Sequence, residues 1–545
     1  MELLLKRKEV NPNATDVQYG RTPLSWAAGN GHFIVTKLLL VHNGIDPGLA
    51  DKRGRTPLSW ATEYGHEEVM GVLVEQTGAD PMTRDIDGRT PISWAAQHWH
   101  GEPCISYLEG AGVGLDLSDR NGRTLLSWAA SGGNACLVKY LLKRNDINPN
   151  LADHDYHTPL SRAAQSYSEK VVSVLLECKD VNPNCRDKYG RTPLWWAAQG
   201  WYGAIVQLLL DRTDVDPNLA DKYGETPLLR AAQNREAEIL QLILGRPDVN
   251  PNLANKDGQT PLLCAIEEDR EGHVQLLLER TDVDLNLADK YGRTPLSLAV
   301  NRQQGVGTVK LLLNRANVDL SLADKNGRTP LSWAVGGRWG EEAVQLLLAR
   351  ADVNPNLADK DGRTPLSWAA GGLWTAGAAK LLLERADVDP NLADKNGRTP
   401  LSLAAGGVEL LLERVDAHGR TPLSWDTGDL CRCDVQVELL LKRADLDPNL
   451  ADKDGRTPLL RASKSSALLT VLLLLQRTDI DLNLADKNGQ TPFSWALRQY
   501  LLGLVIPNPR GFRRQIRYCF ILSALLTYRL RMALNAPSHQ GAIGE

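Results

Sequence analysis

Residues 289–296 read Asp-Lys-Tyr-Gly-Arg-Thr-Pro-Leu, and this stretch decides the fold of the chain. Asp at the first position and Gly at the fourth favour a tight turn. Thr followed by Pro predicts a helix start, because a Thr side chain can cap a helix and Pro suits the first helical position. After a short apolar face formed by Leu296 and Ala299, a second helix is expected over residues 309–314. One unit is therefore a turn followed by two short helices.

The same pattern recurs along nearly the whole chain of 545 residues. The Thr of the pattern stands at positions 22, 56, 90, 124, 158, 192, 226, 260, 294, 329, 364, 399, 421, 457 and 491. Neither short helix could bury its apolar face alone, so successive units must stack on one another. The repeat therefore predicts an all-α solenoid.

The repeated motif Asp-x-x-Gly-x-Thr-Pro-Leu, followed by Ala-Ala, Gly-His and Leu-Leu-Leu, resembles the ankyrin repeat. The Gly-His pair is intact at residues 31–32 and 65–66, and the resemblance covers about residues 1–500. It implies a stack of helix pairs with short β-hairpin or turn fingers. It also implies a protein that binds other proteins on its concave face and has no catalytic activity.

Two features depart from the family pattern. Ser often replaces the His that follows Thr-Pro-Leu, as at Ser59 and Ser297, although its hydroxyl can still bond locally. The fingers carry an extra residue, with Asp-Pro-Asn at residues 216–218 and 389–391. We expect the fold to survive both changes and the shape of the fingers to differ.

The domain organisation follows from the spacing of the repeats. We expect a partial repeat (second helix and finger) over 1–20, a main array over 21–402, a truncated repeat or kink over 403–420, terminal repeats over 421–502 and a basic apolar tail over 503–545. Residues 2–7 match residues 438–443, so the chain is expected to begin inside a second helix, as part of a longer protein or from a misplaced start. The tail could cap the last repeat, form a poorly ordered extension or lie on an anionic membrane surface.

Composition and motifs limit the class of function. The formal net charge is −4, which gives no reason to expect nucleic acid as a partner. The eight Cys form no paired CxxC motif, and no signal peptide or membrane span is apparent, so we expect an intracellular protein, most simply cytoplasmic, with the nucleus left open. The sequence lacks a phosphate-binding loop, His-Glu-x-x-His and Gly-x-Ser-x-Gly. We therefore expect no enzyme, no cofactor, no metal and no small-molecule substrate.

The loops between the two helices of each unit vary most and hold large side chains. Aromatic residues and Arg are enriched where binding energy concentrates in protein interfaces. The candidate partner-binding residues in these loops are Trp99, Tyr167, Trp201, Tyr202, Arg235, Arg270, Arg302, Arg338, Trp339 and Trp374. The alternative is that these side chains only cover the helix ends.

A second set of candidates lies four residues after the repeated Thr. Trp occupies this position in nine units, and Arg occupies it in three. Because an unpaired Arg is costly in a dry core, the position is expected to be partly exposed on the groove side. We predict partner contacts from Trp128, Arg162, Trp196 and Arg230, with Arg162 stacked on the two Trp residues. Packing between adjacent repeats is the alternative.

An Arg stands directly before the Thr in eleven units, usually with an Asp four residues earlier, as in Asp289 and Arg293. We interpret these residues as pairs that stabilise the finger, and a row of Arg that binds an acidic partner is the alternative. The sequence as a whole predicts a protein-interaction scaffold. One alternative is the sensing array of a larger NACHT-type signalling ATPase, and a second is a membrane-surface adaptor that binds through residues 503–545.

Overall fold

The computed structural model describes residues 10–98, 118–337, 340–372, 375–405, 433–505 and 512–534. Within these ranges the regular structure consists of helices, with no strand, which confirms the predicted all-α repeat solenoid. The finger, the segment that joins one helix pair to the next, is a series of turns in the described residues. The chain divides into two compact units: unit 1 holds residues 1–264 and 275–283, and unit 2 holds residues 265–274 and 284–545.

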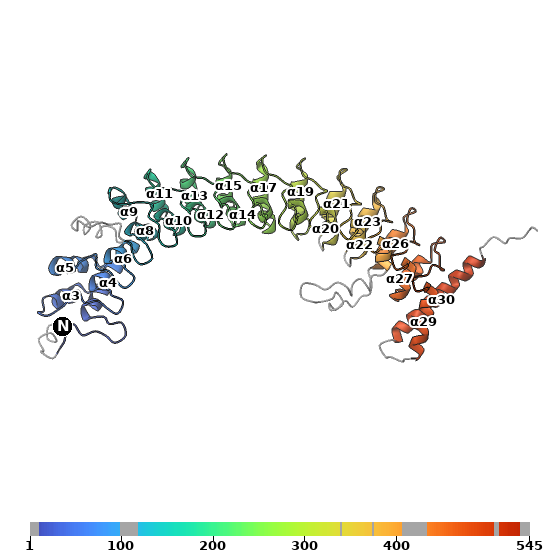
Figure 1. Ribbon diagram of the computed structural model, residues 1–545, viewed down its shortest axis with the longest axis horizontal. Helices are drawn as coiled ribbons and strands as arrows, with labels where there is room; N and C mark the ends of the chain where they lie inside the picture. The colour runs from blue at the N-terminus through green and yellow to red at the C-terminus, as the bar shows by residue number, and fades with distance from the viewer. Residues whose placement is uncertain are drawn as a thin grey trace, which may run out of the picture. The chain divides into compact units, whose positions relative to one another are not determined.

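Unit 1 is a stack of helix pairs (Figure 1). Its first helices are α2 (Pro23–Gly29), α4 (Pro57–Glu63), α6 (Pro91–Gln97), α8 (Leu125–Ser131), α10 (Pro159–Gln165), α12 (Pro193–Gln199) and α14 (Pro227–Gln233). Its second helices are α3 (Phe33–Leu40), α5 (Glu67–Thr77), α9 (Ala135–Leu142), α11 (Glu169–Glu177), α13 (Gly203–Leu210) and α15 (Ala237–Leu244). Two helices, α16 (Pro261–Glu267) and α17 (Glu271–Glu279), cross the boundary between the units.

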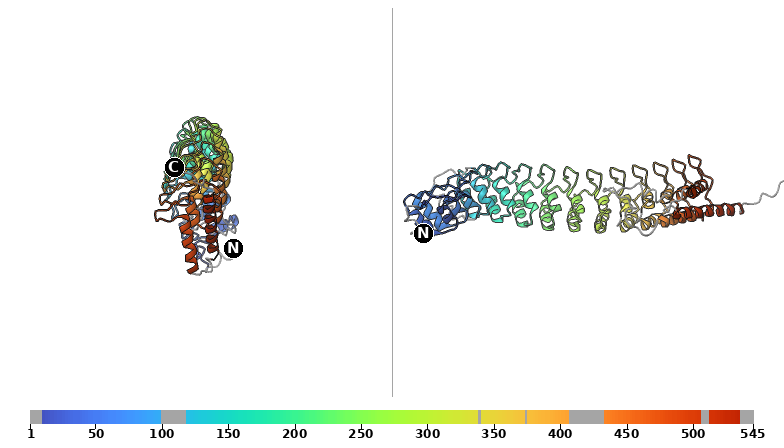
Figure 2. Two further views of the ribbon diagram at one scale, coloured as in Figure 1. Left: turned by 90° about the vertical axis from the view of Figure 1, so that its right-hand side faces the viewer. Right: turned by 90° about the horizontal axis from the view of Figure 1, so that it is seen from below.

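Unit 2 repeats the arrangement, and within each unit the fingers line up in one row (Figure 2). Its first helices are α18 (Pro295–Ala299), α20 (Pro330–Gly336), α22 (Pro365–Ala370), α24 (Pro400–Ala405), α27 (Pro458–Lys464) and α29 (Pro492–Val505). Its second helices are α19 (Gly305–Leu313), α21 (Glu341–Leu348), α23 (Ala376–Glu384), α26 (Cys433–Leu441), α28 (Leu468–Leu474) and α30 (Phe512–Leu534).

The repeated Thr-Pro starts each first helix in the predicted way. In α4, Thr56 is extended and its hydroxyl accepts a hydrogen bond from the backbone N–H of Ser59, while Pro57 opens the helix. The Ser59 hydroxyl accepts in turn from the N–H of Thr56 at 3.3 Å, which completes a capping box. The Ser that replaces the family's His therefore holds the helix start together.

The turn before a first helix usually contains Gly, although Tyr156, with a φ of 63°, replaces it before Thr158. The N–H of Gly54 donates to the carbonyl of Asp51 at 2.8 Å, and Gly54 has a φ of 73°. A Cβ there would also lie 3.1 Å from the backbone nitrogen of Ile86 in the next finger. Any other residue would be strained by its backbone conformation and crowded by its neighbour. The conserved spacing of Asp and Gly thus sets both the turn and the distance between successive fingers.

The core of each unit runs continuously between helix pairs. Leu58 and Ala61 of α4 and Val69 and Leu73 of α5 are all buried, and they share one cluster with Leu39 of α3. The fully buried Ala side chains let the helices approach closely. Because each pair buries its apolar face against the next pair, the stack is held by contacts between neighbours.

The short spacing between positions 399 and 421 predicted a truncated repeat or kink. Residues 406–432 lie outside the described residues, but their flanks, α24 and α26, pack against each other. The N–H of Lys453 donates to the carbonyl of Asn396 at 2.8 Å, so the finger before α24 contacts the finger before α27 directly. The described flanks therefore form one repeat, with α24 as its first helix and α26 as its second.

Candidate protein-binding surface

A buried carboxylate organises each finger and ties it to the first helix. In unit 1, one oxygen of Asp51 accepts from the backbone N–H groups of Arg53 and Arg55 at 2.8 and 2.9 Å. The other oxygen accepts from the indole Nε1 of Trp60 at 3.1 Å. The same three hydrogen bonds recur around Asp85, Asp119, Asp187, Asp324 and Asp359. The Trp that follows the repeated Thr thus has a structural partner in the finger.

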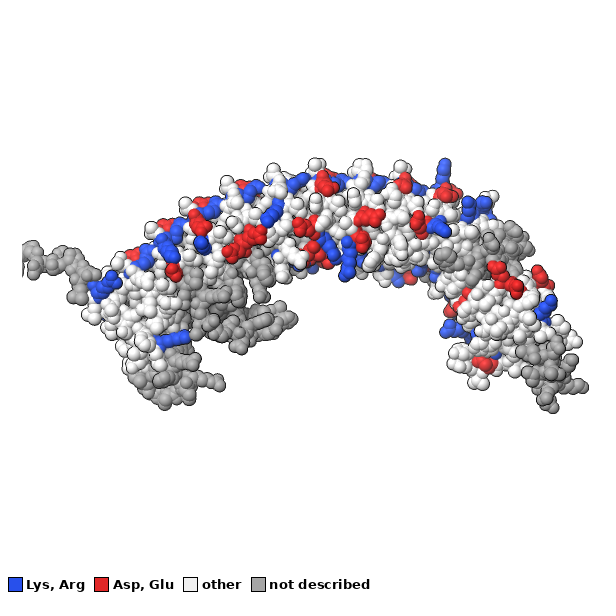
Figure 3. Space-filling model, turned by 180° about the vertical axis from the view of Figure 1, so that it is seen from behind, with Lys and Arg blue, Asp and Glu red and all other residues white. Residues whose placement is uncertain are grey.

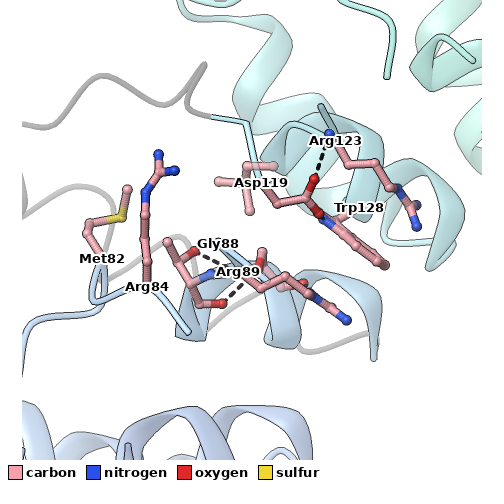
Figure 4. Close-up of a pocket in the computed structure, with 10 residues that line it drawn as sticks. Met82, Arg84, Gly88, Arg89, Asp119, Arg123 and Trp128 are labelled. Atoms are coloured by element: carbon pink, nitrogen blue, oxygen red, sulfur yellow. Dashed lines mark hydrogen bonds between the residues drawn. The ribbon is translucent and has the colours of Figure 1, made fainter. Parts of the chain in front are cut away.

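The Arg before each Thr fills the space between successive Trp rings. The guanidinium carbon of Arg89 lies 3.3 Å from the ring centre of Trp94 and 3.7 Å from that of Trp128. Figure 4 shows Arg89 and Trp128. The resulting Arg–Trp column in unit 1 consists of Trp26, Arg21, Trp60, Arg55, Trp94, Arg89, Trp128 and Arg123. Burial lowers the pKa of Arg89 to about 10, which leaves it charged at neutral pH and able to form cation–π contacts.

Units without Trp satisfy the carboxylate in another way. In unit 2, Leu298 stands at the Trp position, and Arg293 donates from Nε to Asp289 at 2.7 Å. In unit 1, Arg162 stands there and donates from Nε to Asp153 at 3.0 Å. The interpretation of Arg and Asp as a pair within one finger therefore holds for Arg293, whereas in the Arg–Trp column the Arg side chain contacts indole rings.

These contacts decide how the second set of predicted residues lies. Trp128 is buried, and Trp196 is half-buried with its indole bonded to Asp187 at 3.2 Å. We expected Arg162 to stack on both rings, but its guanidinium pairs with Asp153. Trp196 instead lies near the rings of Trp195 and His157, at 5.3 and 5.9 Å. Arg230 is half-buried and bonds to Gln233 at 2.9 Å. This set thus serves contacts within and between repeats.

Three of the predicted loop residues of unit 1, in contrast, are exposed. Tyr167, Trp201 and Tyr202 are 42%, 66% and 58% exposed and come from the inter-helix loops of two adjacent repeats. The rings of Tyr167 and Tyr202 lie 5.4 Å apart. We call these three residues the aromatic loop cluster. It brings together three of the residues predicted from the sequence.

The backbone of Tyr167 shows that this cluster is held at a cost. Tyr167 has a φ of 56°, an angle that Gly31, Gly65 and Gly133 adopt at the equivalent position without a side chain. Asp269 and Ser466 adopt it there with smaller side chains, so Tyr167 is distinguished by its large ring. Its ring lies against Gly200, where a Cβ would come within 2.2 Å of the Tyr167 ring. Asn234 of the next repeat fixes the same loop by donating to the carbonyl of Gly200 at 2.6 Å. A strained non-Gly residue that is positioned this closely is typical of a functional site.

The remaining predicted residues differ in how exposed their side chains are. Arg235 follows the cluster in unit 1 and is exposed, whereas Arg270 and Arg302 in unit 2 are half-buried. Arg302 forms an ion pair with Asp269 at 3.1 Å. Four predicted residues lie outside the described residues: Trp99, Arg338, Trp339 and Trp374.

Sequence reasoning missed Tyr64 at the end of α4. Its ring is 55% exposed and stacks on Trp60, with the ring centres 6.3 Å apart. The two residues are four apart on one helix and therefore share a face. That spacing was the available signal in the sequence.

The fingers form a stiff frame beneath these surfaces. Arg246 donates to the carbonyl of Leu210 in the preceding repeat at 2.8 Å and pairs with Asp248. The hydrogen bond from Arg246 lowers the pKa of Asp248 below its ordinary value, and that of Arg246 rises. The arginines that bridge to a preceding carbonyl while pairing with their own Asp are Arg212, Arg246 and Arg280 in unit 1 and Arg350, Arg385, Arg443 and Arg477 in unit 2.

An Asn in the finger connects one finger to the next. Asn184 donates from its side chain to the carbonyl of Asp214 at 2.7 Å and accepts from the N–H of Asp216 at 2.9 Å in the next finger. The same pair of bonds is made by Asn150, Asn218, Asn286, Asn356, Asn391 and Asn449. These bonds connect successive fingers within each unit, so the frame under the surface is preformed.

The cavity drawn in Figure 4 lies between two fingers of unit 1 and measures about 20 Å³, room for about one water molecule. Among the described residues, no group of three or more His, Cys, Asp or Glu side chains is placed to hold a metal ion. The arrangement offers projecting rings and charged groups on a stiff frame, which suits contact with another macromolecule.

These features define a helical repeat solenoid. A family model for ankyrin repeats, built from three copies, matches residues 1–85, 76–153, 92–187, 132–221, 179–252, 228–321 and 303–389. The chain therefore belongs to the ankyrin-repeat family. Such repeats are generally protein–protein interaction modules and typically lack catalytic activity. No curated protein matches this chain.

Proposed function

We propose that the chain is an interaction scaffold that binds a partner protein on its concave face, against the first helices and inter-helix loops. The aromatic loop cluster of unit 1 is the anchor of that contact. The observation that carries the proposal is Tyr167, whose strained backbone and contact with Gly200 present a large ring at a position where Gly31, Gly65 and Gly133 have no side chain. Exposed Tyr and Trp side chains on a rigid frame supply binding energy with little loss of conformational freedom.

The cluster is tested by placing a photo-crosslinking amino acid at position 201 of the full chain. We expect specific protein adducts that disappear when Tyr167 and Tyr202 are changed to Ala. The matched control is a crosslinker at position 223, since Tyr223 is 56% exposed on a finger of the same unit. Adducts of equal yield at both positions, or adducts that survive Tyr167→Ala and Tyr202→Ala, would move the binding surface elsewhere.

Gly200→Ala provides a second test that retains the side chains of Tyr167 and Tyr202. The added methyl group would collide with the Tyr167 ring and shift it. We expect weaker crosslinking from position 201, with the melting behaviour of the protein nearly unchanged. Full crosslinking by this variant would contradict the role of ring placement.

The same surface would serve either of two kinds of protein. In a free-standing scaffold the captured partner is another component of an assembly. In the recognition array of a larger NACHT-type signalling ATPase, the captured molecule is the signal that the ATPase senses. Identification of the adducts from position 201 distinguishes the two, because only a sensed molecule would change ATPase activity in such an assembly.

A further inference from the structure

The last helix of unit 2, α30, covers the end of the stack with one face. Tyr518, Ile521, Leu525 and Tyr528 are buried, and α30 packs against α28 and α29. The hydroxyl of Tyr528 donates to the carbonyl of Arg477 at 3.0 Å. This inner face therefore supplies the contact that a further repeat would otherwise make.

The outer face of α30 is also apolar. Ile516, Phe520, Leu526 and Leu530 are 41–63% exposed and recur at helical spacing on the side away from the buried residues. Phe520 lines a groove of about 390 Å³ that it shares with Leu472 of α28. A helix that is apolar on both faces normally has a covering on both. Among the described residues, only the inner face of α30 is covered.

The neighbouring helices extend this apolar surface. Leu469 and Leu472 of α28 and Leu501 and Leu502 of α29 are exposed. Other second helices of unit 2 have charged groups outside, such as Glu342 on α21, whereas α28 contains only Leu, Val and Thr. The exposed apolar residues are thus spread over three helices, which is broader than a single docked helix would cover.

The segment of the sequence that contains α30 carries charge of one sign. Residues 487–544 contain eight Lys and Arg and no Asp or Glu, although the whole chain has a net charge of −4. Arg529 and Arg531 are exposed beside Leu530. In Figure 3 the described surface around the last helices consists mostly of uncharged residues, drawn white, with some Lys and Arg, drawn blue. Two copies of this surface would repel each other, so the complementary occupant is anionic.

We propose that the outer face of α30 docks on a membrane surface that contains anionic lipids. Phe520, Leu526 and Leu530 would enter the boundary between head groups and acyl chains, while Arg529 and Arg531 would contact lipid phosphates. The helix lies along the surface: within the described residues, no helix is long and apolar enough to cross a bilayer. The stretch without charge between Arg517 and Arg529 is correspondingly short.

The test is flotation of the full chain with phosphatidylcholine vesicles, with and without phosphatidylserine. We expect flotation only with phosphatidylserine. The double variant Phe520→Ser/Leu530→Ser should bind about tenfold more weakly, because it removes two of the inserted side chains. Arg529→Gln/Arg531→Gln should also weaken binding and make it less sensitive to salt. The matched control is Ile34→Ser, which changes an exposed apolar side chain of α3 in unit 1 and should float normally.

Three outcomes would overturn the membrane proposal. They are failure of the unchanged chain to float with phosphatidylserine, equal flotation without it, and flotation that neither double variant reduces. Binding of an acidic amphipathic helix by a chain that does not float would assign the surface to a protein instead. The variant Tyr167→Ala/Tyr202→Ala should float normally, so loss of the aromatic loop cluster and loss of membrane docking are separable.

Discussion

Two finger–helix junctions, one from each unit, use different side chains to donate a hydrogen bond to the buried Asp carboxylate of the finger. In unit 1, Asp85 accepts from the indole of Trp94, and Arg89 is left to stack between rings. In unit 2, Leu298 has no side-chain N–H, and the guanidinium of Arg293 donates to Asp289 instead of an indole. The carboxylate must be satisfied because it is buried, but the donor can change. The repeat therefore conserves a contact rather than a residue.

Removing the carboxylate should destabilise such a junction more than any other single change. Asp85→Ala leaves two backbone N–H groups and an indole N–H without their acceptor, and we expect a loss of about 3 kcal/mol in local stability. The measurement is hydrogen exchange at the amides of Asp87 and Arg89 together with urea unfolding of the full chain.

Asp85→Asn is the matched control for that change. Asn255 occupies the equivalent position in its repeat and still accepts from the N–H groups of Asp257 and Gln259. We therefore expect the Asn variant to lose about 1 kcal/mol. Equal losses for Ala and Asn would show that acceptance of the backbone N–H groups is not the source of the stability.

Trp94→Leu should convert one junction into the other. Once the indole is gone, Arg89 is free to turn toward Asp85, as Arg293 does toward Asp289, and we expect a loss of about 2 kcal/mol from reduced packing. Trp94→Ala should cost clearly more, since no Leu-sized side chain then fills the space. Urea unfolding of both variants checks the order, and equal losses would mean that Leu cannot substitute in this setting.

Arg246→Lys tests the connection between successive fingers. Lys keeps the charge but cannot pair with Asp248 through two nitrogens while also donating to the carbonyl of Leu210. We expect a loss of about 1 kcal/mol in urea unfolding. Lys380→Ala on α23 removes an exposed pair 3.9 Å from Glu384 and should change little, so a similar loss in both variants would refute a special role for the finger.

Low pH should weaken the Arg–Asp pairs of the fingers, and the loss of stability at each pair should be smaller than that caused by Arg246→Lys. The hydrogen bonds from Arg246 and Arg280 lower the pKa values of Asp248 and Asp282 in the folded state. The unfolded state therefore binds more protons, and stability is fully present above the ordinary carboxyl pKa of about 4 and is lost as pH falls through the lower folded values. Thermal unfolding between pH 7 and pH 2 measures this, and a melting temperature that does not fall below pH 4 would contradict it.

The sequence predicted the elements of the site better than their contacts. The exposed aromatic loop residues Tyr167, Trp201 and Tyr202 followed from the variation of the loops on a constant repeat. The role of Trp128 did not, because its Asp partner is nine residues away and its Arg neighbour belongs to another repeat. Tyr64 was missed, although its spacing from Trp60 on one helix pointed to a shared face.

The sequence by itself determined the repeat, the helix starts at each Thr-Pro and the turn at each Gly, because these depend on local hydrogen bonds and backbone angles. Tertiary structure alone decided that Arg89 lies between two Trp rings, that Tyr167 rests on Gly200, and that α24 and α26 share one repeat. Each of these depends on which surface of a neighbouring repeat comes into contact, and such a contact is fixed only when the repeats stack.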